Sequence, residues 1–240
     1  PRDALTLDTA AETDAIKTAF SDLSERGIVR IDPLSPPTLD ALVAAVNAHS
    51  YHIIHFDGHG TFGRRCQYCG RYQPEDTIFC TTPNCGARLD EATLEGCLLF
   101  ESNTGDRLSQ MVTPHELGTV LTGRQVRLFI ASACQSGAVK GASVFSSIGP
   151  RLLLAGIPAV VAMQFAVPID STVAFSAEFY ASLARSESVA AAATAGRKML
   201  VSRGTWHIPA VYLRSRDGEG NLFRFHDQQR PFGGLISGAG

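Results

Sequence analysis

Residues 53–60 read IIHFDGHG, and this stretch decides how the rest of the chain is interpreted. Its apolar beginning is typical of a buried strand, and it ends in a histidine between two glycines. Histidine titrates near neutral pH and often serves as a general acid or base, while flanking glycines let the backbone approach a substrate closely. A turn that happens to contain a histidine is the alternative. We take His59 as the first candidate catalytic residue.

A second stretch, residues 126–137, has the same pattern and reads VRLFIASACQSG. Its apolar run is followed by a residue with a reactive side chain, Cys134. Along the chain, apolar runs of strand length alternate with helical patterns. This predicts an α/β fold with a mostly parallel sheet covered by helices on both faces. Functional groups in such sheets gather at the carboxyl ends of the strands. We therefore expect His59 and Cys134, each just past the end of a strand, to lie at one edge of the sheet.

Hydrophobic periodicity and end signals assign the elements. Helices are expected to begin at a capping box in residues 9–12, at 35–36 and at 113–116, and to span residues 170–183 and 187–202. Strands are expected at residues 28–31, 52–56, 97–100, 126–131, 158–163 and 210–213. Residues 152–169 are uncharged, but Pro158 and Pro168 would break a spanning helix. We therefore expect a helix end, a buried strand and a loop there, and no membrane span.

The composition is that of a globular protein with a substantial core: 240 residues, of which 45% are hydrophobic and 18% charged. A net charge of −2 gives no electrostatic reason to expect a nucleic-acid or membrane partner. No basic segment leading into an apolar one opens the sequence. We therefore expect no secretory signal and a cytoplasmic, reducing location.

Four of the six cysteines form a metal-binding pattern within residues 66–86, CQYCGRYQPEDTIFCTTPNCG. Two closely spaced cysteine pairs are typical of a structural zinc site with four thiolates, and disulfides or free thiols are the alternative. We expect one zinc ion per chain, held by Cys66, Cys69, Cys80 and Cys85. Residues 64–90 are then a zinc-ribbon insertion within one domain of residues 1–240. The insertion is too small to bury a core, so the metal must supply much of its folding energy.

The insertion also accounts for the spacing of the two candidate catalytic residues. His59 and Cys134 are 75 positions apart, and 48 positions remain when residues 64–90 are left out. Caspase-type cysteine proteases carry their histidine about 50 residues before the cysteine. The spacing therefore favours a catalytic pair interrupted by an inserted loop.

Three stretches together resemble the CHAT domain, a caspase-like peptidase family related to caspases, separases and gingipains: HFDGHG, LFIASACQSGAV and AGIPAVVAMQFAVPIDSTVAFSAEFYASL. The resemblance covers about residues 27–213, and the zinc ribbon lies outside the family pattern. It implies a caspase-like three-layer sandwich and a cysteine endopeptidase with His59 and Cys134 as its dyad. It also implies an oxyanion hole formed by the backbone N–H groups of Gly60 and Cys134, and a regulatory partner such as a tetratricopeptide-repeat protein.

Substrate selection is expected to involve the loop at residues 164–170, where the resemblance places the pocket for the side chain before the scissile bond. Asp170 is a candidate for selecting Arg or Lys, and the alternative is that it caps the following helix. Phe165 is a candidate pocket wall, and without an acid in the pocket we expect an apolar preference. Asp57 is a further candidate, either for orienting the loop that carries His59 or for a direct role in substrate binding.

The remaining cysteine and histidines are expected to be structural or exposed. Cys97 lies in an apolar run and is expected in the core, and His115 is expected at the surface. His55 is expected to be structural or to support a residue of the site.

The leading functional hypothesis is a regulated bacterial cysteine endopeptidase that cleaves a protein substrate in defence or cell death. The alternative is an inactive caspase-like scaffold that binds protein partners through the zinc ribbon. A nucleic-acid-binding ribbon is a third hypothesis, which is disfavoured because its arginines are offset by acidic residues.

Overall fold

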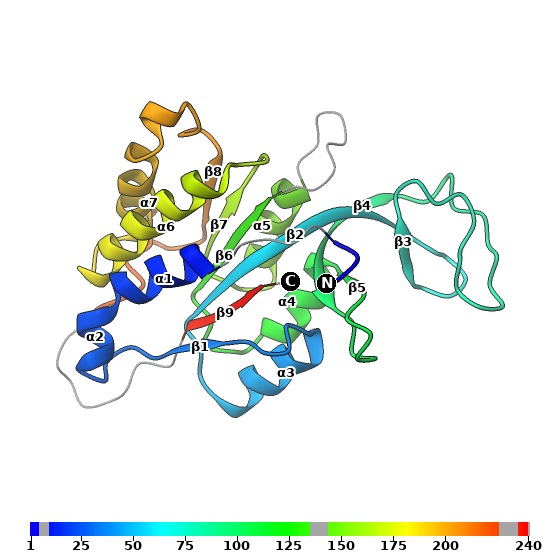
Figure 1. Ribbon diagram of the computed structural model, residues 1–240, viewed down its shortest axis with the longest axis horizontal. Helices are drawn as coiled ribbons and strands as arrows, with labels where there is room; N and C mark the ends of the chain where they lie inside the picture. Colours follow the sequence, from blue (N-terminus) through cyan, green and yellow to red (C-terminus); the bar gives the residue numbers. More distant parts are fainter. Residues whose placement is uncertain (5–9, 135–143, 226–234, 240) are drawn as a thin grey trace.

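The computed structural model describes residues 1–4, 10–134, 144–225 and 235–239, with the backbone alone at 133–134, 144–147 and 235–239. A nine-stranded sheet forms its framework (Figure 1). The central strands are ordered β1-β9-β2-β6-β7-β8, and all neighbours in this row are parallel except β7 and β8. Their bounds are Ile31–Pro33, Leu235–Ala239, Ile53–Arg65, Leu128–Cys134, Ala159–Met163 and Pro209–Leu213.

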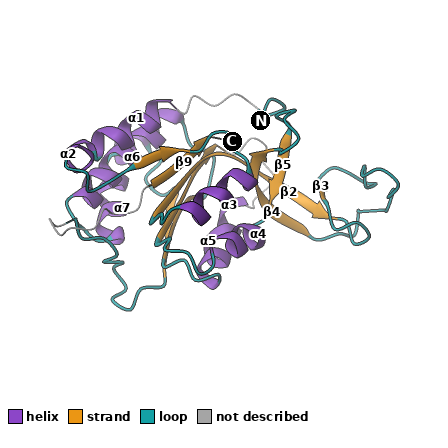
Figure 2. Ribbon diagram, turned by 90° about the horizontal axis from the view of Figure 1, so that it is seen from below, coloured by secondary structure: helices purple, strands orange, loops and turns teal. Residues whose placement is uncertain are grey.

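Helices cover both faces of this sheet (Figure 2), because side chains alternate between the faces along each strand. Ile53, Leu128 and Ile130 pack on one face against α1 (Ala10–Ala19), α2 (Ser21–Glu25), α6 (Ile169–Ala184) and α7 (Val189–Lys198). Ile54, Phe56 and Phe129 pack on the other face against α3 (Leu39–Ala48), α4 (Pro114–Leu121) and α5 (Val144–Leu154). A short 3-10 helix, Val201–Arg203, follows α7. The expected caspase-like three-layer sandwich is confirmed.

Strand β2 is much longer than expected and corrects the predicted position of His59. It continues past Phe56 to Arg65 and pairs antiparallel with β4 (Leu94–Glu101), from His59 opposite Leu99 to Arg64 opposite Leu94. His59 therefore lies inside a strand and not past its end. Two short strands complete the sheet: β3 (Tyr72–Pro74) pairs with the end of β2, and β5 (Ser109–Val112) pairs with β4.

Residues 61–97, here called the arm, project from the sheet (Figure 1). The arm consists of the ends of β2 and β4 with β3 and the cysteine-rich loops between them. Arg64 and Arg65 pair with β3 inside the sheet. The predicted insertion, residues 64–90, therefore begins inside β2, and its first two residues are the end of that strand.

Most other elements lie close to their predicted bounds. Helix α4 begins at the expected capping box, in which the hydroxyl of Thr113 accepts from the N–H of Glu116 and the Glu116 carboxylate accepts from the N–H of Thr113. The strand expected at residues 28–31 begins only at Ile31. Ile28 and Val29 follow α2, and their N–H groups instead donate to the carbonyl of Leu23 inside that helix. None of the helices in the described part of the chain is long and apolar enough to span a bilayer.

Candidate active site and metal centre

His59 and Cys134 are register partners on neighbouring parallel strands. The ladder between β2 and β6 runs from Ile53 opposite Leu128 to His59 opposite Cys134, the last residue of β6. Adjacent strands lie about 4.8 Å apart, so the two backbones are side by side at the carboxyl end of β6. The sequence predicted that these two residues lie close together at one edge of the sheet, and their backbones do lie side by side. Their catalytic roles stay predictions, and the side chain of Cys134 lies outside the described part.

The backbone of His59 is held from both sides, by β6 and by β4. Its side chain is 1% exposed. Strand alternation puts His55, Asp57 and His59 on the face of the sheet that α1 and α6 cover. Asp57 is half-buried and lies opposite Ser132 in β6, two residues before the pair formed by His59 and Cys134.

A buried polar cluster occupies the same face, four residues before His59. The His55 Nδ1 lies 2.9 Å from the hydroxyl of Tyr180 in α6, and its Nε2 lies 3.4 Å from a carboxylate oxygen of Glu12 in α1. Glu12 also accepts hydrogen bonds from Ser132, at 2.8 and 3.0 Å, and from Ser176, at 2.5 Å. His55 is therefore structural in this arrangement, as expected.

Electrostatics keeps Glu12 charged despite its burial. Burial raises the pKa of Glu12, but His55 and the hydroxyls of Ser176 and Ser132 together outweigh burial and lower that pKa below its ordinary value. Burial, and then the charge of Glu12, raise the pKa of Tyr180 well above its ordinary value, so this residue stays a phenol. The sequence indicated Glu12 only as part of a capping box with Thr9. Thr9 lies outside the described residues, and the carboxylate instead contacts the sheet and α6.

The predicted capping role of Asp170 is wrong. Helix α6 begins one residue earlier, at Ile169, and Pro168 occupies the N-cap position without a side-chain cap. The Asp170 carboxylate is largely exposed and lies 3.5 Å from the Nε of Arg203. A role for Asp170 in substrate selection stays a prediction.

Sequence reasoning missed two aromatic residues beside Phe165. The ring of His207 lies 6.3 Å from the ring of Phe165 and 6.0 Å from that of Trp206, between centroids. Phe165 and Trp206 are each about half exposed. The ladder between β6 and β7 ends where Ala131 pairs with Ala162, and Cys134 and Phe165 each follow that pair by three residues in the sequence. The only tryptophan of the chain, placed just before a strand, was the available signal.

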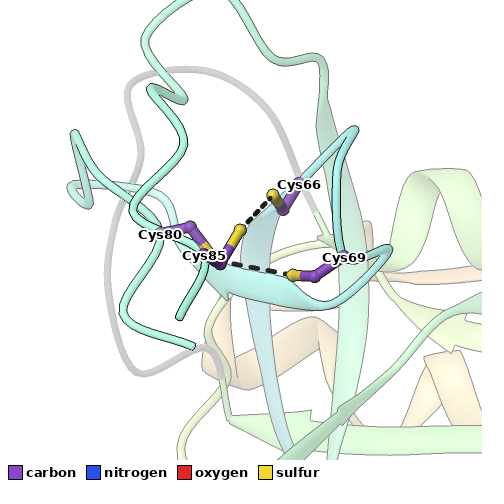
Figure 3. Close-up of side chains that lie close together, drawn as sticks. All are labelled: Cys66, Cys69, Cys80 and Cys85. Carbon is purple, nitrogen blue, oxygen red and sulfur yellow. Dashed lines mark hydrogen bonds between the residues drawn. The ribbon is translucent and has the colours of Figure 1, made fainter. Parts of the chain in front are cut away.

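Four cysteine sulfurs converge in the arm (Figure 3). The Cys66 and Cys85 sulfurs lie 3.5 Å apart, the Cys69 and Cys80 sulfurs lie 3.6 Å apart, and all four lie within 4.8 Å of one another. A disulfide requires about 2.05 Å, so these contacts are not disulfides. Tetrahedral zinc with Zn–S bonds of about 2.3 Å would place its sulfurs about 3.8 Å apart. The four residues therefore fit a metal ion of this kind.

The surroundings of the cysteines favour a thiolate at Cys69 and a fixed loop, whereas burial and the neighbouring cysteines raise the pKa of Cys85 to about 12. The hydroxyl of Thr82 lies 3.5 Å from the Cys69 sulfur, and this contact and the backbone N–H of Arg71 lower the pKa of Cys69 to about 6. Leu89 is buried and packs with Cys66 and Cys80. This small cluster is the arm's own core.

Arg64 ties the loops of the arm together. Its guanidinium donates hydrogen bonds to the carbonyls of Glu75 at 2.7 Å and Ala92 at 2.8 Å, with longer contacts to Leu89 at 3.4 Å and Asp90 at 3.3 Å. One side chain at the end of β2 thus orders two separate loop segments.

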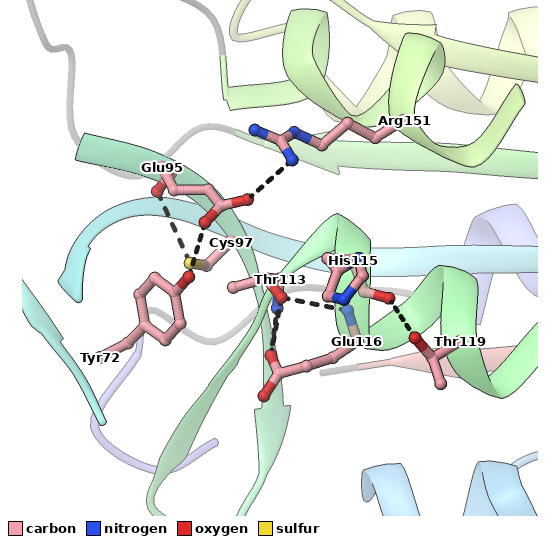
Figure 4. Close-up of polar contacts among 8 residues, drawn as sticks. All are labelled: Tyr72, Glu95, Cys97, Thr113, His115, Glu116, Thr119 and Arg151. Atoms are coloured by element: carbon pink, nitrogen blue, oxygen red, sulfur yellow. Dashed lines mark hydrogen bonds and ion pairs between the residues drawn. The ribbon is translucent and has the colours of Figure 1, made fainter. Parts of the chain in front are cut away.

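The root of the arm is closely packed against the body of the domain (Figure 4). The Tyr72 hydroxyl donates to the Glu95 carboxylate at 2.6 Å, and Arg151 of α5 lies 3.6 Å from the same carboxylate. A Cβ on Gly63 would lie 3.0 Å from the sulfur of Met111 and 3.2 Å from the ring of Tyr72, so this position has little room for a side chain.

Two further predictions are tested near the root of the arm. Cys97 is buried, as expected for a core residue, and burial raises its pKa to about 12. His115 is exposed in the first turn of α4, as expected, and its carbonyl accepts a hydrogen bond from Thr119 at 2.9 Å (Figure 4).

A comparison with protein-family models places the chain in a known family. A family model described as the CHAT domain matches residues 6–232, which include both candidate catalytic residues and the whole arm. No curated protein matches the chain. The matched range extends beyond residues 27–213, where the sequence motifs indicated the resemblance, and it reaches the helices that cover both faces of the sheet.

Proposed function

The chain belongs to the CHAT domain family, and on that premise we propose that it is a cysteine endopeptidase with His59 and Cys134 as its catalytic dyad. The observation that carries the proposal is the register pair between these two residues at the end of β6. A thiol and an imidazole on directly opposite residues of adjacent strands start within reach of each other. This is the requirement for a nucleophile activated by a base.

In the proposed reaction, the Cys134 thiolate attacks the carbonyl carbon of the scissile peptide bond and forms an S–C bond. His59 donates a proton to the amine as the C–N bond breaks, and the acyl group stays on the sulfur as a thioester. His59 then takes a proton from water, which hydrolyses the thioester and frees the thiolate. The backbone N–H groups of Gly60 and Cys134 are the proposed donors to the oxyanion of each tetrahedral intermediate.

We propose that the side chain before the scissile bond is apolar. Phe165 is half exposed and follows the end of β7, His207 lies beside it, and Trp206 lies beside His207. Asp170 already has Arg203 as an ion-pair partner, so its carboxylate would bind a cationic substrate side chain less strongly. Selection of Arg or Lys by a freed Asp170 is the alternative. Asp57 is assigned to orienting the strand that carries His59.

We propose Zn²⁺ as the metal of the arm, held by all four cysteines. A closed set of four thiolates leaves no open position for a substrate, so the role of the ion is structural. We also propose a cytoplasmic location, since the described cysteines form no disulfides with one another. A tetratricopeptide-repeat regulator and a role in bacterial defence or cell death are further proposals, which rest on the family resemblance alone.

The dyad is tested with a peptide mixture derived from a proteome, because this probe requires no known substrate. Mass spectrometry identifies the new ends that the wild-type protein creates. Cys134→Ala is expected to abolish cleavage while the protein stays folded, and Cys97→Ala, which removes a buried thiol, is the matched control and is expected to retain cleavage. Cleavage at the same sites by folded Cys134→Ala protein would contradict the proposed function.

A further inference from the structure

The end of β6 has less backbone support than the rest of that strand. Strand β7 pairs with β6 only as far as Ala131 opposite Ala162. From Ser132 to Cys134, the ladder with β2 is the one that continues among the described strands. The backbone of the proposed nucleophile therefore lies at a strand end that is paired on one side.

Glu12 supplies a contact at this strand end. The hydroxyl of Ser132, which lies two residues before Cys134, donates to this carboxylate and is within hydrogen-bond distance of both of its oxygens. The same carboxylate lies 3.4 Å from the Nε2 of His55, on the strand that carries His59. Glu12, Ser132 and His55 are all 5% exposed or less. One carboxylate from α1 thus bridges the two strands of the proposed dyad.

A buried carboxylate is a poor way to gain stability alone. Removing a charge from water costs several kcal/mol, and apolar residues of similar size often stabilise a core as well or better. Hydrogen bonds to a carboxylate are directional and fix distances within a few tenths of an ångström, whereas apolar packing is not directional. The cluster around Glu12 is therefore better suited to fixing the relative position of β2 and β6 than to filling space in the core.

We propose that Glu12 and Ser132 are positioning residues that hold the end of β6 against β2, so that Cys134 and His59 keep the geometry of a thiolate–imidazolium pair. This inference rests on the proposed function. Ser176 serves as an internal comparison, because its hydroxyl donates to the same carboxylate from α6 and contacts neither strand of the dyad through that bond.

The test measures the rate of alkylation of Cys134 by iodoacetamide as a function of pH, followed on its own peptide by mass spectrometry. This readout requires no substrate, and a paired thiolate reacts below the ordinary cysteine pKa of about 8.5. Melting temperatures are measured on the same samples. The proteins are wild type, Ser132→Ala, Ser176→Ala and Glu12→Gln, and the two serine variants keep the inference testable if Glu12→Gln does not fold.

Ser132→Ala is expected to slow alkylation at neutral pH by about tenfold and to move the profile toward an ordinary thiol, since a misplacement of 1 Å can cost about 100-fold. Ser176→Ala is expected to lower the melting temperature comparably and to keep the wild-type profile. Equal profiles for the two serine variants, or a wild-type profile for Ser132→Ala, would overturn the positioning role and leave the dyad standing. An ordinary thiol profile in the wild-type protein would overturn the dyad and the positioning role together.

Discussion

His55 and His59 lie four residues apart on the same face of β2, yet they have different neighbours. His55 contacts the Tyr180 hydroxyl and the Glu12 carboxylate, whereas His59 lies opposite Cys134 in the ladder. Both side chains are 1% exposed, so burial does not distinguish them. The difference in function that we expect follows from the neighbouring groups alone.

Replacing each histidine is expected to separate stability from catalysis. His55→Ala leaves the buried Tyr180 hydroxyl and Glu12 carboxylate each without one polar partner, which costs about 1–3 kcal/mol for each group in the free energy of unfolding. His59→Ala is expected to lower cleavage by roughly 100-fold to 10,000-fold, the usual contribution of a general acid or base, with a smaller effect on stability. Urea unfolding and peptide cleavage measured on both variants provide the check. A stable, inactive His55→Ala protein would reverse the two assignments.

The charge of Glu12 is expected to give stability that depends on pH. Its pKa is lowered in the folded state, below the ordinary value of about 4.3 that applies to the unfolded chain. Its contribution is therefore fully present above about pH 4.3 and is lost as the pH falls through the folded pKa. The difference in unfolding free energy between wild type and Glu12→Gln should be constant near neutral pH and shrink in acid. A difference that grows in acid would show a raised pKa instead.

At the scale of elements, the arm has little apolar burial of its own, as expected for a segment whose four cysteines could hold a metal ion. The cluster of Cys66, Cys80 and Leu89 is its own buried core. The ends of β2 and β4 fix its base, and Arg64 orders its loops through backbone carbonyls. The spacing of the cysteines predicted this metal site because thiolate ligands must be close in sequence to form a knuckle.

Arg64 is expected to tune metal affinity although it contacts no cysteine sulfur. Purified wild-type protein should contain about one equivalent of zinc. Arg64→Met frees loop carbonyls on both sides of the site and is expected to weaken zinc binding about tenfold, as removal of supporting groups commonly does. Arg65→Met, at the exposed neighbouring position, is the control and should bind as wild type. Competition against a chelating dye measures the zinc affinity of both variants. Equal affinities would show that Arg64 does not support the metal site.

The sequence predicted those elements whose end signals and packing residues lie close together in the chain. Helix α4 follows its capping box, and strand β7 is an apolar run of five buried residues. The sequence indicated only the end of helix α5, in the stretch from residue 152, and Pro150 lies inside that helix. The extension of β2 was missed because its pairing partner, β4, lies some 30 residues away, beyond the cysteine loops.

At the scale of the whole molecule, the features that sequence could not predict depend on distant partners. Strand β9, at residues 235–239, lies between β1 and β2, which come from the first quarter of the chain. Glu12 meets Ser132 and Ser176 across more than 100 residues. The candidate dyad could be predicted because topology brings strand ends together, whereas the polar cluster beside it depends on how α1 and α6 pack.

The continuity of β2 also suggests what the arm does. One strand runs from His59 to Arg65, so the metal site has a fixed direction relative to the proposed dyad. Tyr68, Ile78 and Phe79 are exposed on the arm, where large apolar side chains are rarely required for folding. A rigid loop presents such a surface at little entropic cost, which favours recognition of a substrate or partner over an inert insertion.

Replacing residues 65–93 with a short Gly-Ser turn tests this role and keeps Arg64 opposite Leu94 in the ladder. The sheet is expected to fold, because both of its cores lie outside the replaced segment. Cleavage of a short unstructured peptide should be retained, because the dyad needs only β2 and β6. Cleavage of an intact protein substrate found with the wild-type enzyme should fall by more than tenfold, the equivalent of about 1.4 kcal/mol of lost recognition. Equal retention of both activities would show that the arm does not recognise the substrate, and loss of both would show that it supports the active site directly.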